Sequence, residues 1–194
     1  CNEEHHTLMH GNVPRSLKEY AIHTTETISM CIVPIRLYHK DKSIEILTYA
    51  LLDENCQGTF VLESIINDFS IDYRKTSITT ETINGAVTES SLAVDGLIVK
   101  PLPRFEEEYG SSEIVLPTAY SREVLSCDED DIPTPNSIED FSYLHCIIDK
   151  LPDYNPSLTL LGLVMGANCP KALEHQEIVQ SVGDGTYASR SVLG

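Results

Sequence analysis

The chain has few basic residues, no long apolar run and no signal peptide of the basic-then-apolar kind. Thirteen lysines and arginines stand against thirty aspartates and glutamates, which gives a net charge of −17. Such a charge repels phosphate backbones, so binding of nucleic acid through the chain's own field is not expected. No stretch approaches the roughly 20 consecutive apolar residues of a membrane span. We therefore expect neither a membrane nor a nucleic acid as partner.

The sequence also lacks a closely spaced Cys-x-x-Cys pair. Cysteines that are widely spread in this way are typical of reduced thiols, so an intracellular, cytoplasmic protein is predicted. The first residue is a cysteine rather than methionine, which indicates either a gene-model boundary or a segment of a larger polyprotein. The six cysteines are Cys1, Cys31, Cys56, Cys127, Cys146 and Cys169.

At 194 residues, 41% of them hydrophobic, the chain is long enough for one medium-sized domain with a buried core. Much of the negative charge is concentrated in residues 106–108 and 128–131. Neither run has the spacing of a calcium-binding EF-hand loop, so both are interpreted as solvated loops rather than metal sites.

The first half of the chain has the pattern of β-structure. Residues 29–38 and 43–52 each show an alternating pattern with β-branched residues, which predicts two strands joined by a short loop. A short helix is expected over 63–69. The Asn84-Gly85 pair favours a type I′ turn, which predicts a β-hairpin over 79–89. A further strand is expected over 92–99, a loop over 101–112 and a short strand over 113–116.

The second half begins with the best candidate for an internal linker, residues 126–136, which hold four acids and two prolines. After it, Ser137 and Asp140 have capping-box spacing, and apolar residues on one face predict a helix up to residue 151. The apolar run 158–165 predicts a buried strand or pair of strands, and 171–176 a last helical turn.

The most informative stretch is 49–56 (YALLDENC), followed at once by 57–61 (QGTFV). A strand-like apolar run brings Asp53 into a turn, and a second apolar run leaves that turn. Asp53 is therefore either a turn aspartate at the end of a strand or a catalytic carboxylate. Cys56 is interpreted as a small buried thiol rather than a nucleophile, because no histidine is tied to it by a recognisable motif.

Four segments together resemble the retropepsin-like aspartic proteases of retrotransposon polyproteins, in particular the BEL/Pao group. The resemblance runs from about residue 28 to the C-terminus. It rests on the order and spacing of 50–53 (ALLD) with 59–61 (TFV), 115–120 (VLPTAY), 164–170 (VMGANCP), and 183–188 (GDGTYA) with 193–194.

The resemblance implies a mainly β protein: a closed β-barrel of the acid-protease fold, with a flap hairpin and one or two added helices. The implied domains are a polar tail at 1–24, a protease domain at 25–180 that contains an acidic linker and helix at 126–152, and a C-terminal tail at 181–194. Val164, Met165 and Gly166 would support the catalytic loop from below. The flap would carry Ile83, Asn84, Gly85 and Ala86.

The resemblance also implies an aspartic endopeptidase that processes a polyprotein without a cofactor. Asp53 would form a catalytic dyad with its copy in a homodimer, with a peptide or polyprotein segment as substrate. Asp95 and Asp184 could instead provide the second carboxylate within one chain. Each of them precedes a glycine without a new apolar run, which is typical of a simple turn, so two copies of Asp53 are favoured.

The active-site loop departs from the usual Asp-Thr/Ser-Gly motif, because Glu54, Asn55 and Cys56 follow the aspartate. Asn55 suits a tight turn. Glu54 offers no hydroxyl and adds a negative charge beside the dyad, which would raise the pKa of the dyad. The alternative function is therefore a catalytically inactive retropepsin-fold module for dimerisation or peptide binding.

The N-terminal residues Cys1, His6 and His10 resemble the end of a retroviral zinc knuckle. Zinc takes four nitrogen or sulfur ligands in structural sites, and only three are in view here. We therefore expect no metal site in this fragment. A nucleic-acid-binding fragment is a third hypothesis, which only residues 1–10 support and which the net charge opposes.

Overall fold

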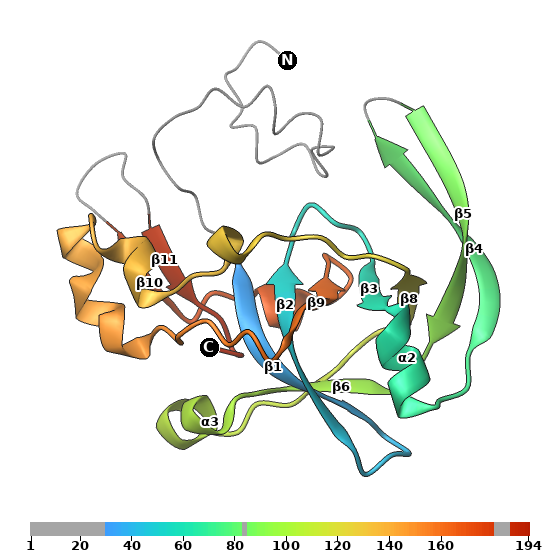
Figure 1. Ribbon diagram of the computed structural model, residues 1–194, viewed down its shortest axis with the longest axis horizontal. Coiled ribbons are helices and arrows are strands. Elements are labelled where there is room, and N and C mark those ends of the chain that lie inside the picture. The colour runs from blue at the N-terminus through green and yellow to red at the C-terminus, as the bar shows by residue number, and fades with distance from the viewer. Residues whose placement is uncertain (1–29, 83–84, 181–186) are drawn as a thin grey trace.

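The computed structural model describes residues 30–82, 85–180 and 187–194 (Figure 1). The tail predicted for 1–24, with Cys1, His6 and His10, lies outside the described residues. Ile83, Asn84 and Asp184 lie outside them as well. Within the described ranges, no helix has both the length and the apolar character needed to cross a bilayer.

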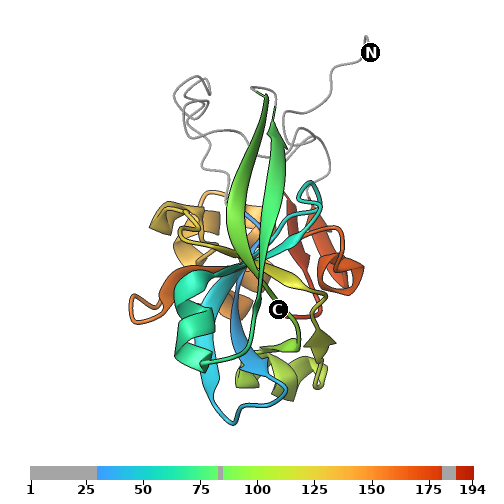
Figure 2. The same cartoon turned by 90° about the vertical axis from the view of Figure 1, so that its right-hand side faces the viewer.

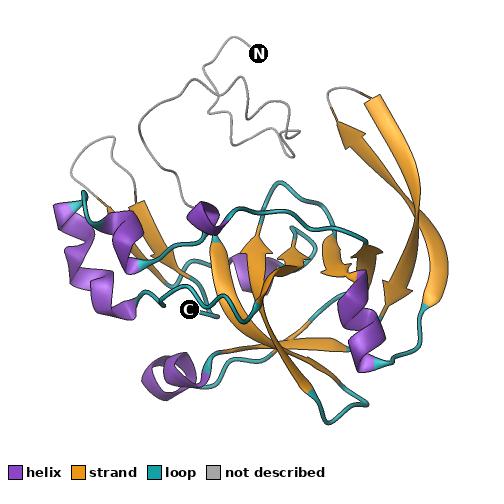
Figure 3. Ribbon diagram, viewed as in Figure 1, coloured by secondary structure: helices purple, strands orange, loops and turns teal. Residues whose placement is uncertain are grey.

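The protein is mainly β and is built around one mixed sheet of nine strands (Figure 3). The strand order is β4-β5-β8-β3-β9-β2-β1-β6-β7. Two further strands, β10 (Glu177–Gln180) and β11 (Tyr187–Arg190), form a separate antiparallel pair. The strands of the main sheet are β1 (Ile32–His39), β2 (Glu45–Leu52), β3 (Thr59–Leu62), β4 (Arg74–Thr82), β5 (Gly85–Val94), β6 (Leu97–Pro101), β7 (Ile114–Val115), β8 (Ala119–Arg122) and β9 (Thr159–Met165).

Strand β9 is inserted between β2 and β3, the two strands that flank the Asp53 turn. It pairs in parallel with β2 and antiparallel with β3. Residues 161–165 of β9 are buried, as expected for a central strand covered on both faces. Because β9 separates β2 from β3, residues 53–58 must pass over the end of β9 to connect these two strands.

The closed barrel expected from the resemblance is not found in the described part of the chain. Strands β4 and β7 are the two ends of the strand order, and no pairing between them is observed there. Two features of these strands explain why. Strand β7 has only two residues, and β4 continues into a long hairpin whose side chains are largely exposed.

Several predicted elements are confirmed, and others need correction. Helix α2 spans Glu63–Phe69 as expected, and β1, β2 and β9 match their predicted runs closely. The predicted strand 92–99 is two strands, because Gly96, with φ of +86°, turns the chain between β5 and β6. Helix α3 (Pro103–Tyr109) occupies the predicted loop 101–112 and carries the acidic run 106–108.

The helix predicted for 137–151 is instead a series of 3₁₀ turns. They span η3 (Pro135–Ile138) and η4 (Ser142–Lys150), after a shorter turn, η2 (Glu129–Asp131). The capping box joins Thr134 and Ser137 rather than Ser137 and Asp140, so the first turn begins earlier than predicted. Phe141, with φ of −107° and ψ of 82°, interrupts the turns.

The core extends to the last residues of the chain, so residues 187–194 are not the tail that was predicted. Leu193 is fully buried in the main hydrophobic cluster, and Gly194 lies against the ring of Phe105. The predicted linker is also anchored, since Cys127 and Ile132 are buried in a second cluster that includes Tyr49. Another short helix, η5 (Pro170–Leu173), follows β9.

Asp95, at the turn between β5 and β6, is expected to stabilise the fold in a pH-dependent way. Hydrogen bonds from the Thr118 hydroxyl (2.5 Å) and then from Arg74 (3.2 Å) hold its pKa below the usual value. A lowered pKa contributes stability above the unfolded-state pKa and loses it as the pH falls through the folded-state pKa. The groups are exposed, so Asp95→Asn should lower the melting temperature at pH 7 by only about 1–3 °C.

This difference between wild type and Asp95→Asn should disappear when melting is followed at a pH below the folded-state pKa of Asp95. A difference that grows on acidification would contradict the assignment.

Candidate active site

The Asp53 loop, residues 53–58, continues directly from β2 and is tied to the end of β9. The amide of Asp53 donates to the carbonyl of Met165 at 3.0 Å. The amide of Cys56 donates back to the carbonyl of Asp53 at 3.1 Å, which closes a tight turn. Within this turn the amide of Asn55 donates to Oδ1 of Asp53 at 3.0 Å. The chain's own backbone thus fixes the orientation of the Asp53 carboxylate.

Gly166 lies directly beneath this loop. A Cβ atom at Gly166 would collide with the carbonyl oxygens of Cys56 and Gly58, which are backbone atoms and cannot rotate away. The amide of Ala167 donates to the Cys56 carbonyl at 2.7 Å. Only glycine therefore permits the backbone after β9 to approach the loop so closely. Met165 is fully buried and Val164 is nearly so, which places an apolar support under the turn.

A polar contact that sequence analysis missed anchors the far end of the loop. Thr59, the first residue of β3, is fully buried, and its hydroxyl donates to Oδ1 of Asn168 at 2.9 Å. Both residues lie in segments that carried the family resemblance, 59–61 and 164–170. A buried threonine at the start of an apolar strand was the signal that could have identified this anchor.

Exposure differs along the loop. The side chain of Asp53 is half-buried, whereas those of Glu54 and Asn55 are exposed. Glu54 therefore reaches solvent beside Asp53 rather than supporting the turn. Desolvation raises the pKa of the Cys31 thiol, and the negative charges of Glu54 and Asp53 in the loop raise it further.

Cys56 does not have the environment of a nucleophile. Desolvation raises the pKa of its thiol and the charge of Asp53 adds to this, while the charge of Arg122 opposes it. The Sγ atom lies 3.3 Å from the Gly58 carbonyl and donates to it. A thiol with a raised pKa is protonated at neutral pH, so Cys56 serves the loop as a weak donor.

The predicted hairpin is present as β4 and β5, which pair from Arg74↔Ala93 to Thr82↔Gly85. The far end of the hairpin and the Asp53 loop lie on the same side of the molecule (Figures 1 and 2). Gly85 has φ of +119°, which favours glycine, and Ala86 is exposed opposite Glu81. Of the four residues expected in the flap, only Gly85 and Ala86 are therefore described.

The structure brings the Asp53 loop together with Val164, Met165 and Gly166, and it places Asp95 in a different environment. Asp95 is held at the root of the hairpin by Thr118 and Arg74. Each chain thus presents Asp53 as one half-exposed carboxylate on a supported loop. Within the described ranges, no cluster of three or more histidine, cysteine or acidic side chains could hold a metal ion.

A half-exposed carboxylate such as that of Asp53 can act as a general base or can bind a polar group of a ligand.

We compared the chain with protein-family models, with curated proteins and with solved structures, and none of the three comparisons gave a match.

Proposed function

We propose that this chain is an aspartic endopeptidase of the retropepsin-like type that acts as a homodimer. One observation carries the proposal: Asp53 is half-exposed on a tight loop, and Gly166 supports this loop by direct backbone contact. The hairpin on the same side of the molecule would cover an extended peptide. The resemblance of segments around both the loop and Gly166 to retropepsins agrees with this proposal.

In the proposed mechanism two copies of Asp53, one from each subunit, lie close enough to share a proton. Two adjacent carboxylates cannot both ionise easily, so they share one proton. The ionised carboxylate takes a proton from a water molecule, which attacks the carbonyl of the scissile peptide bond. The protonated carboxylate polarises that carbonyl. As the C–N bond breaks, the proton taken from water passes to the amide nitrogen, which leaves as an amine, and the dyad returns to its singly protonated state.

The proposed substrate is an extended peptide segment, such as a junction in a polyprotein. An extended chain between the hairpin and the Asp53 loop could pair with the backbone of the hairpin, as peptides do when they add to a sheet. No cofactor takes part in this scheme.

The exposed side chain of Glu54 favours a second candidate, an inactive module for dimerisation or peptide binding. A glutamate beside each Asp53 would bring two more carboxylates to the dimer axis, where like charges oppose one another. This alternative uses the same loop and hairpin but predicts binding without hydrolysis.

The test of the proposal is whether the purified chain cleaves an unfolded protein substrate, and how its activity depends on chain concentration. Because each active site needs two chains, the cleavage rate should rise with the square of the chain concentration while most chains are monomeric, that is, below the dissociation constant of the dimer. Cys56→Ala should retain most of the activity, because its thiol takes no part in the proposed chemistry and gives the loop only a weak hydrogen bond. Binding of the unfolded protein without cleavage, at every chain concentration tested, would instead support the inactive module.

A further inference from the structure

Arg122, the last residue of β8, links the outer part of the β4–β5 hairpin to the body of the protein. Strand β5 pairs with β8 only at Ala93↔Tyr120 and Val94↔Ala119, within the described residues. Farther along the hairpin, β4 and β5 pair with each other. Two hydrogen bonds to Ser121 extend this attachment, one from the Leu92 amide to its hydroxyl (2.9 Å) and one from the buried Ser91 hydroxyl to its carbonyl (3.0 Å).

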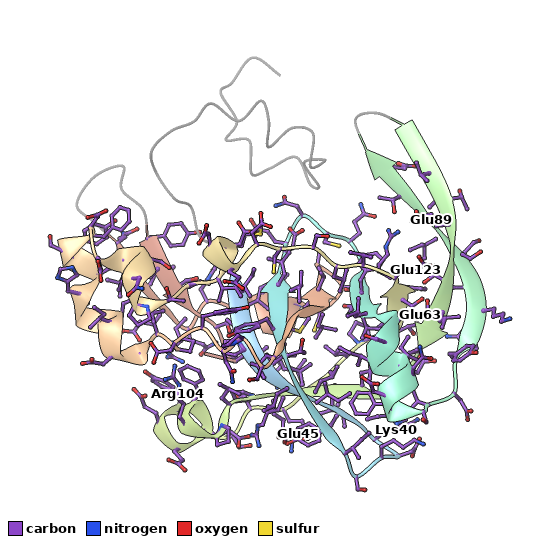
Figure 4. All side chains as sticks on the ribbon, viewed as in Figure 1. Lys40, Glu45, Glu63, Glu89, Arg104 and Glu123 are labelled. Carbon is purple, nitrogen blue, oxygen red and sulfur yellow. The ribbon has the colours of Figure 1, made fainter. Side chains whose placement is uncertain are left out.

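Beyond that point the side chain of Arg122 contacts both strands of the hairpin. Its guanidinium forms an ion pair with Glu89 on β5 and donates from Nη2 to the hydroxyl of Thr80 on β4 at 2.7 Å. Thr80 pairs with Val87 and Ile78 pairs with Glu89, so Thr80 and Glu89 lie on the same face of the hairpin. Figure 4 labels Glu89 part-way along the hairpin, between its far end and the body.

The same guanidinium is connected to the strand that leaves the Asp53 loop. It lies over the ring of Phe60 on β3, 5.0 Å from the ring centroid. Backbone pairing of Arg122 with Leu62 fixes its position relative to that strand. The side chain of Arg122 is 23% exposed and that of Glu89 is 52% exposed, so the guanidinium is the more sheltered end of this ion pair. The positive charge of Arg122 also acts on Cys56, where it offsets part of the rise in the pKa of the thiol.

We infer that Arg122 is a positioning residue that holds the hairpin at a set distance from the Asp53 loop. Three contacts in different directions, to Glu89, Thr80 and Phe60, restrict the guanidinium to one place. The planar guanidinium can stack on an aromatic ring and donate in two directions at once, which lysine cannot do. Breaking these contacts removes the support of the body from the outer hairpin, so that the outer pairing of β4 with β5 opens more often.

The test compares Arg122→Gln with wild type by hydrogen exchange of the backbone amides of residues 85–90. Exchange in the variant should be about fivefold faster there, because the hairpin loses its contact with the body. Arg122→Lys should give an intermediate rate, since lysine restores the charge but not the planar contacts. Glu89→Gln should resemble Arg122→Gln, and combining the two should add little.

Arg74→Gln is the matched control, because Arg74 also pairs with a carboxylate but at the root of the hairpin. This control should leave exchange at 85–90 unchanged. Equal exchange in wild type and Arg122→Gln would overturn the inference, as would equal acceleration by Arg74→Gln.

A second readout rests on the proposed function. If the chain cleaves peptides, Arg122→Gln should raise KM about fivefold and leave kcat nearly unchanged, because a loosened hairpin weakens substrate binding. A raised KM with unchanged hydrogen exchange would overturn the inference, since Arg122 would then act on the substrate directly. If wild type cleaves nothing, the proposed function fails, but the exchange experiment still decides the role of Arg122.

Discussion

Replacing Gly166 by alanine is expected to destabilise the fold by about 3 kcal/mol and to displace the Asp53 loop. The added methyl group would meet the carbonyl oxygens of Cys56 and Gly58, which belong to the backbone of the loop. The loop could yield only by losing the hydrogen bond from the Ala167 amide to the Cys56 carbonyl. In a chain of this size the melting temperature should fall by roughly 6–12 °C, which calorimetry or circular dichroism would measure.

Gly58→Ala is a matched control from the same loop. A Cβ atom at Gly58 would lie 3.5 Å from the ring of Phe60, which is an ordinary van der Waals distance. This variant should therefore melt close to wild type. Equal melting temperatures for Gly166→Ala and Gly58→Ala would contradict the close approach of the loop backbone to Gly166.

Much of the strand pattern could be predicted from the sequence because its signals are local. Alternating β-branched residues identified β1 and β2, and the Asn-Gly pair identified the hairpin of β4 and β5. Helix α2 was predicted with its observed bounds. In the structure Gly166 lies against the backbone of the Asp53 loop.

The errors arose where tertiary packing decides the outcome. The 137–151 pattern has helical spacing, but an earlier capping box at Thr134 and an interruption at Phe141 divide it into 3₁₀ turns. The C-terminal residues carry no obvious signal of burial, yet Leu193 completes the core. Closure of a barrel depends on pairing between distant edge strands, which no local pattern reports.

The site shows the same division between local and tertiary signals. Asp53 became a candidate because an apolar run ends at it, which is a local feature. The anchor between Thr59 and Asn168 joins residues that are far apart in the sequence, and the contacts of Arg122 with the hairpin depend on side-chain direction. Spacing along the sequence indicates neither the Thr59–Asn168 contact nor the Arg122 contacts, because they depend on how β9 and β8 align with β3.

Asp53→Asn is expected to lower kcat/KM for peptide cleavage by about 10³-fold, because both members of the proposed dyad are lost together in a homodimer. Asparagine has nearly the same shape as aspartate, and its side-chain oxygen can still accept the hydrogen bond from the Asn55 amide. The loop should therefore keep its conformation, and the melting temperature should change little. The side-chain amide cannot take a proton from water, so hydrolysis should fail while substrate binding remains.

Asp95→Asn is the appropriate control for this loss of activity, because Asp95 is a described aspartate that precedes a glycine and could be mistaken for a catalytic residue. It is hydrogen-bonded to Thr118 and Arg74 at the hairpin root, so its replacement should leave kcat/KM within about twofold at a temperature where both variants are folded. Cleavage that survives Asp53→Asn would reject Asp53 as the catalytic carboxylate. If Asp95→Asn abolished activity instead, the two-chain dyad would have to be replaced by a site at the hairpin root.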